Sequence, residues 1–174
     1  MGRGREPQRL LAAALRQGPA WAIALDADDR VEREFRRRAE ATIRRDRWRG
    51  RRAFGVKVRE LWDAPDQYRA DGIWGRKRQA RLFELRADHV VDDRELHGHK
   101  APLQCRDRHG NYARANLEIH HLRMLTAESR EARRRRYEEF DPSSRLQPDH
   151  GYAYLTDPAG LRLKRIRPDR LFVE

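Results

Sequence analysis

Three acidic residues that follow a short apolar run are the clearest candidates for chemistry in this sequence. Asp26, Asp28 and Asp29 come directly after residues 22–25, which include no polar side chain. Such a run is typical of a parallel strand covered on both faces, and alternation then places Asp26 and Asp28 on one side of the chain. Because two such carboxylates repel each other without a cation between them, the pattern predicts a site for Mg²⁺ or Mn²⁺. The alternative is an acidic turn that caps a helix beginning near Val31.

A pair of histidines far along the chain could complete this metal site. His120 and His121 end residues 116–122, which are predicted to form a strand. Alternation along a strand sends one imidazole inward and the other outward. If the inward one is His120, it could join Asp26 and Asp28 as a ligand, since Mn²⁺ accepts imidazole as well as carboxylate. The alternative is a core histidine that is hydrogen-bonded to the backbone.

An irregular stretch rich in tryptophan, tyrosine and glycine offers candidates for a general base. Asp63, Asp66 and Asp71 all lie within residues 62–78. One of them could accept a proton from a hydroxyl group if it is held close to that proton. The alternative is that these aspartates cap or turn the chain, as most loop aspartates do.

Other histidines suggest two further kinds of chemistry. His97 and His99 could bind phosphate or line a cleft, with simple packing in a loop as the alternative. The histidine pair after the predicted strand at 116–122 resembles the beginning of an HNH nuclease site, which His150 would have to close. The fit is poor, because no asparagine follows the pair and the cysteines of a zinc knuckle are absent.

The composition limits the class of protein. The chain has 174 residues, with 40 Lys and Arg against 28 Asp and Glu and a net charge of +12. This excess favours phosphorylated or polyanionic partners, and a basic nucleic-acid-binding protein is therefore an alternative function. The single cysteine, Cys105, excludes an internal disulfide. No apolar run approaches the roughly 20 residues of a membrane span, and no signal peptide is present, so we expect a cytoplasmic protein without a transmembrane segment.

The periodicity of apolar residues predicts both helices and strands, and the run at 22–25 is typical of strands in proteins of the α/β class. Helices are predicted at residues 8–17, 31–45 and 126–140, and strands at 21–25, 53–61, 80–85 and 116–122. No repeat or low-complexity linker interrupts the chain. We therefore expect a single domain over residues 1–174, in which residues 126–174 form a C-terminal helix and tail.

Seven segments stand in an order and at a spacing that are similar to those of a known family. They are residues 21–29, 68–75, 81–83, 117–121, 133–137, 141–142 and 151–155. Together they resemble the distal part of a family 2-type glycosyltransferase of the GT-A fold, from about residue 6 onward. The resemblance implies a GT-A-like (Rossmann-like) mixed sheet flanked by helices.

The same resemblance implies a reaction and a role for each site residue. Asp26 and Asp28 match the DxD-type motif, which binds the Mg²⁺ or Mn²⁺ that holds the diphosphate of a nucleotide-sugar donor, with Asp29 as a further contact. His120 matches a histidine that can serve as a further ligand, and Asp71 lies where an acceptor-side base is expected. The implied function is metal-dependent transfer of a sugar from the donor to a hydroxyl of an acceptor glycan or small molecule, because the metal can neutralise the charge of the leaving diphosphate.

The sequence departs from this family at its beginning. Members of the family start with a strand–loop–helix portion that binds the base and the ribose of the nucleotide, whereas only 20 residues precede Trp21 here. We therefore expect a member that is truncated at the N-terminus, or one whose missing part another chain supplies. Alone, it is expected to be weakly active or inactive.

Overall fold

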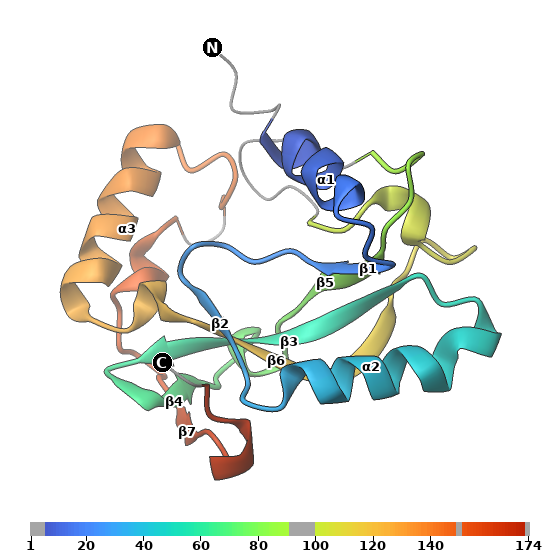
Figure 1. Cartoon of the computed structure of the whole chain (residues 1–174). Helices are drawn as coiled ribbons and strands as arrows, with labels where there is room; N and C mark the ends of the chain where they lie inside the picture. Colours follow the sequence, from blue (N-terminus) through green and yellow to red (C-terminus); the bar gives the residue numbers. More distant parts are fainter. Residues whose placement is uncertain (1–5, 91–99, 149–150, 173–174) are drawn as a thin grey trace. The chain divides into compact units, whose positions relative to one another are not determined.

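The computed structural model describes residues 6–90, 100–148 and 151–172, which contain both helices and strands (Figure 1). This combination of helices and a sheet is compatible with the α/β class predicted from the sequence. The chain divides into two compact units, and each unit is built from three separate stretches of chain. The first unit comprises Met1–Asp26, Glu34–Lys57 and Arg78–Leu117, and the second comprises Ala27–Arg33, Val58–Lys77 and Glu118–Glu174.

The first unit is built on antiparallel strands. Strand β1 (Trp21–Ile23) pairs with β5 (Arg78–Glu84), and β5 pairs with the first half of β3 (Ala53–Trp62). Helix α1 (Glu6–Arg16), which is rich in strong helix formers, packs Leu11 against the core. The buried members of this core are Leu11, Ala53, Phe83, Leu85, Ala101 and Cys105.

A second helix, α2 (Phe35–Asp46), also belongs to the first unit. Its buried side chains are spaced three or four residues apart, which is the spacing of one helix face: Phe35, Ala39, Thr42 and Asp46. A 3₁₀-helix, η2 (Arg47–Arg49), continues directly from α2, and another, η4 (Leu103–Cys105), lies later in the unit.

The strand predicted at residues 21–25 differs from the one observed. β1 is only three residues long, half-buried and antiparallel to its neighbour, so the prediction of a parallel strand covered on both faces is wrong. Beyond Ile23, the Ala24 N–H still donates to the Arg81 carbonyl oxygen of β5 at 2.8 Å, and the Arg81 guanidinium donates to the Ala24 carbonyl oxygen at 3.1 Å. Apolar residues alone could not show that this segment would pair with an antiparallel strand.

The second unit contains the remaining elements. Its strands are β2 (Asp29–Val31), β4 (Ala64–Arg69), β7 (Leu163–Arg165) and the ends of β3 and β6 (Ala113–His121). Within the unit β2 pairs with β6, β3 with β4, and β4 with β7, each time antiparallel. The helix predicted to begin at Val31 begins only at Phe35, because residues 29–31 pair with β6 instead.

Helical segments complete the second unit. The helix α3 (Ala127–Phe140, orange in Figure 1) is capped by Thr126, whose Oγ1 accepts a hydrogen bond from the Ser129 N–H. Short 3₁₀-helices also occur: η3 (Trp74–Arg76), η5 (Leu122–Met124), η6 (Ala153–Leu155) and η7 (Pro168–Arg170). A core of Trp62, Met124, Tyr152 and Leu155 lies within this unit. In the described part of the chain, no helix has the length and apolar character needed to cross a membrane.

A buried ion pair joins distant segments of the second unit. Arg170 Nη1 lies 2.7 and 2.5 Å from the two carboxylate oxygens of Glu32, and both residues are at most 4% exposed. Glu32 Oε1 also accepts a hydrogen bond from the Glu118 N–H at 3.1 Å. The Glu32 carboxylate, which directly follows β2, is therefore bound both to β6 and to the 3₁₀-helix η7.

This pair predicts a large effect on stability. Replacing Glu32 with alanine leaves the Arg170 guanidinium buried without its carboxylate, which we expect to lower the free energy of unfolding by about 3–5 kcal/mol. Urea-induced unfolding measures the change. The control is Asp66→Ala, which breaks an exposed pair with Arg165 and should cost about 1 kcal/mol or less. Equal losses for the two variants would contradict the importance given to the buried pair.

Candidate functional site

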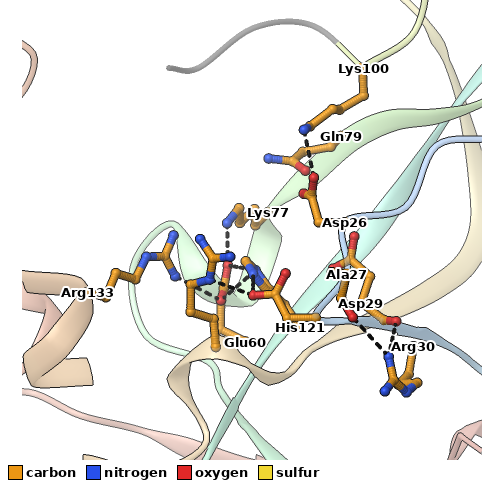
Figure 2. A network of polar contacts seen from close by, with 12 residues as sticks. Asp26, Ala27, Asp29, Arg30, Glu60, Lys77, Gln79, Lys100, His121 and Arg133 are labelled. Carbon is orange, nitrogen blue, oxygen red and sulfur yellow. Dashed lines mark hydrogen bonds and ion pairs between the residues drawn. The ribbon is translucent and has the colours of Figure 1, made fainter. Parts of the chain in front are cut away.

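The candidate site in the second unit is centred on Glu60 of β3 (Figure 2). Its carboxylate is fully buried. Lys77 Nζ donates to Oε1, His121 Nδ1 lies 3.1 Å from Oε2, and Arg133 Nη1 lies 3.8 Å from Oε2. One inaccessible carboxylate thus gathers three side chains that can carry positive charge. We call Asp28, Glu60, Lys77, His121, Arg123 and Arg133 the Glu60 cluster.

The imidazole of His121 lies between two carboxylates. Its Nδ1 faces Glu60, and its Nε2 lies 2.9 Å from Asp28 Oδ2. Backbone pairing of β2 with β6 brings His121 next to Asp28. His121 pairs with Asp29 across this ladder, and the Leu122 N–H donates to the Asp28 carbonyl oxygen at 2.9 Å. Asp28 Oδ2 also lies 2.6 Å from Arg123 Nε.

The charges of the cluster shift the pKa values of its members. Burial by itself would raise the pKa of Glu60, but the hydrogen bond from His121 and the charges of Lys77, His121 and Arg133 lower it to about 2. Burial would likewise lower the pKa of His121, whereas the hydrogen bond to Glu60 and the charges of Glu60 and Asp28 raise it above 6.5. Both ring nitrogens can then donate, so the cluster favours an imidazolium.

Several polar atoms of the cluster have no hydrogen-bond partner among the described residues. Asp28 Oδ1 is one, and Nε and Nη1 of Arg133 are two more, although all three are buried. Buried polar atoms in native proteins are usually paired, and a missing ion or ligand is one reason for an exception. Asp28 thus offers a carboxylate oxygen, and Arg133 offers two N–H groups, for a partner that the described residues do not supply.

Aromatic rings surround the cationic side of the cluster. Lys77 Nζ lies 5.2 Å from the ring centroid of Trp74, which in turn lies 5.7 Å from the ring of Tyr154. The Arg133 guanidinium lies 5.4 Å from the Tyr137 ring. The turn that brings Trp74 here requires Gly75, because a Cβ at that position would collide with the carbonyl oxygen of Ala70.

The structure places Asp26 in the first unit with its own counter-ions. Its carboxylate contacts Lys100 Nζ at 2.8 Å, drawn in Figure 2, and Arg81 Nη2 at 3.1 Å. Burial would raise its pKa, but the hydrogen bonds and charges of Lys100 and Arg81 lower it to about 2. Asp26 and Asp28, predicted to share one cation, thus belong to different units, and each binds cationic side chains of its own unit.

The other predicted ligand, His120, has different neighbours from those expected. Its imidazole is fully buried, its Nε2 lies 2.9 Å from the carbonyl oxygen of Arg170, and its ring lies 5.6 Å from that of Phe172. Burial lowers its pKa. It is therefore His121, and not His120, that contacts Asp28. Across the described ranges, no group of three His, Cys, Asp or Glu side chains is arranged to hold a metal ion.

The aspartates considered as bases are each bound to an arginine. Both oxygens of Asp71 lie 3.0 Å from Arg69 Nε. The other two pairs are Asp63 with Arg130 and Asp66 with Arg165. The predicted roles of His97, His99 and His150 fall on residues outside the described ranges.

Sequence reasoning missed the centre of the cluster, although one signal was available. In the predicted strand at 53–61, Glu60 continues the alternation of Phe54, Val56 and Val58, all of which are fully buried. A carboxylate on the covered face of a strand needs partners that bear positive charge or donate hydrogen bonds. Which cations would supply them could not be read from positions so far apart in the chain.

Comparison with known proteins adds no relative. No family model matches the chain, and neither a curated protein nor a solved structure matches it. The geometry of the site and the chemistry of its residues therefore carry the functional argument.

The raised pKa of His121 predicts a pH-dependent contribution to stability. A group whose pKa is raised on folding stabilises the folded state fully below its unfolded pKa, here about 6.5, and this contribution is lost as the pH rises through the folded pKa. We expect the free energy of unfolding of the wild type to decline over that range more steeply than that of His121→Gln. Urea unfolding between about pH 6 and pH 9 measures both. The exposed His109→Gln is the control, and parallel curves for wild type and His121→Gln would refute the role of the imidazolium.

Proposed function

We propose that the Glu60 cluster binds the diphosphate of a nucleotide-sugar donor in a glycosyltransferase of the GT-A type. The observation that carries the proposal is the Arg133 guanidinium, which lies beside Glu60 and in one cluster with Lys77. Its Nε and Nη1 are buried and have no hydrogen-bond partner among the described residues. Guanidinium and ammonium groups form strong, charge-assisted hydrogen bonds with phosphate oxygens. The acidic segment that contains Asp28 enters the same cluster, which agrees with the resemblance to a DxD motif.

One atom of the cluster is of a type that a divalent cation takes as a ligand, although the described residues supply no complete metal site. Asp28 Oδ1 is a buried oxygen without a hydrogen-bond partner among the described residues, and hard cations such as Mg²⁺ and Mn²⁺ take ligands of this type. When bound, the cation would neutralise the charge of the leaving diphosphate. The Arg123 guanidinium holds the other oxygen of Asp28 at 2.6 Å and so orients the carboxylate.

The chain's own cations would support the same step. In the proposed reaction, the bond between the sugar and the donor phosphate breaks, its electron pair stays with the diphosphate, and the acceptor oxygen bonds to the sugar as its proton passes to a base. Lys77 and Arg133 stabilise the charge that forms on the leaving group. Glu60 holds both cations and keeps His121 against Asp28, so it is a positioning residue. Asp71 remains the candidate base on the acceptor side.

Calorimetry with a nucleoside diphosphate tests this proposal. We expect UDP to bind the wild type in the presence of Mn²⁺, and Asp28→Asn to weaken this Mn²⁺-dependent binding at least about tenfold, because a charged ligand contact is worth roughly 1.5–3 kcal/mol. Asp71→Asn makes the same change of charge outside the Glu60 cluster and should bind like the wild type. The proposal is wrong if the wild type does not bind UDP or if Asp28→Asn binds it unchanged.

The cationic part of the site can be tested without metal. In the presence of a chelator, Lys77→Gln should weaken the remaining binding of UDP about tenfold, since it removes one charge-assisted hydrogen bond to phosphate. Calorimetry again measures the affinity, and circular dichroism checks that the variant is folded. Arg136→Gln, a neutralised arginine at an exposed position of α3, is the matched control. Equal effects of the two variants would show that only the overall charge attracts the nucleotide.

A further inference from the structure

The first unit presents an exposed tryptophan among arginines. The chemistry of this surface differs from that of the Glu60 cluster in the second unit. Trp48 lies in η2 and is 77% exposed, the largest exposed fraction among the large apolar side chains described. Residues 44–52 contain six arginines and a single acidic residue, Asp46. We call Arg44, Arg45, Arg47, Trp48 and Arg49 the Trp48 surface.

The turn that carries Trp48 is held in place by its own contacts. Asp46 is buried and accepts hydrogen bonds from Arg45 Nη2 at 3.0 Å and from Arg49 Nη1 at 2.9 Å. Gly50 adopts a positive φ of 63° and donates its N–H to the Arg47 carbonyl oxygen, which ends η2. The tryptophan is thus displayed by a defined structure that continues from α2.

The ring of Trp48 is also oriented by a neighbouring cation. The Arg49 guanidinium lies 4.6 Å from the ring centroid, within the range of a cation–π contact. One face of the indole is therefore covered by a positive charge. A large apolar ring is kept in solvent beside guanidinium groups that are themselves exposed: Arg44, Arg45, Arg47 and Arg49.

We propose that the Trp48 surface docks onto the headgroup region of an anionic lipid bilayer. Tryptophan is enriched at this depth, because its ring is apolar while its N–H can still bond to water or headgroups. Basic residues close to an anionic leaflet each add about 1 kcal/mol of attraction. Single-stranded nucleic acid fits less well, since such sites stack successive bases on several aromatic rings, and Trp48 is the one aromatic residue within residues 44–52.

Vesicle binding of the full chain tests the proposal. We expect co-sedimentation with vesicles of phosphatidylcholine and phosphatidylglycerol in a ratio of about 3:1, and little with phosphatidylcholine alone. Trp48→Ala should lower the partition coefficient several-fold, whereas Trp48→Phe should retain most of the binding. Arg44→Glu with Arg47→Glu should lower it about a hundredfold, because two attractive charges become repulsive.

A charge-matched variant separates local docking from overall attraction. Arg165→Glu with Arg167→Glu changes the net charge equally on exposed side chains of the second unit, and we expect it to reduce binding less than the pair at Arg44 and Arg47. Equal losses for the two double variants, or unchanged binding by Trp48→Ala, would overturn the proposal. So would tight binding of a single-stranded oligonucleotide that is lost in Trp48→Ala while vesicles are not bound. None of these outcomes depends on whether UDP binds.

Discussion

The buried carboxylate of Glu60 sets the polar structure of the second unit. A carboxylate without access to water is unstable unless cations and hydrogen-bond donors surround it, and Lys77, His121 and Arg133 meet this requirement from three other segments of the chain. The consequence reaches beyond Glu60 itself. His121 becomes a bridge to Asp28, and Arg133 is held with its Nε and Nη1 buried and without a hydrogen-bond partner among the described residues. A carboxylate that is itself buried thus gathers the cations on which the proposed binding of a diphosphate depends.

The sequence was most informative where the physical signal is local. The helix predicted at residues 126–140 is observed as Ala127–Phe140 with Thr126 as its cap, and the apolar spacing of α2 marks the face that packs. Both features depend on residues within one or two helical turns. The shorter β1 and the strand at 29–31 were missed, since they depend on pairing with β5 and β6. Strand pairing is decided by partners far along the chain, and a short apolar segment fits several of them.

The candidate site shows the same division. Asp28 was identified from its acidic motif, but its neighbour proved to be His121, the other member of the histidine pair. Alternation gives the two adjacent imidazoles different partners, but the prediction that one points outward is wrong, because both are buried. Asp26 meets Lys100 and Arg81, and a chain with 40 basic residues supplies such counter-ions readily. The metal, the GT-A fold and the donor remain predictions.

The pair between Glu32 and Arg170 has a consequence for synthesis of the protein. The two residues are separated by 138 positions, so the ribosome must add that many residues after Glu32 before the carboxylate can meet its guanidinium. Until then the Glu32 carboxylate stays hydrated, and the second unit lacks the ion pair that joins its distant segments. Because contacts between remote residues form slowly, the second unit should complete its folding late, and chaperones can bind it in the meantime.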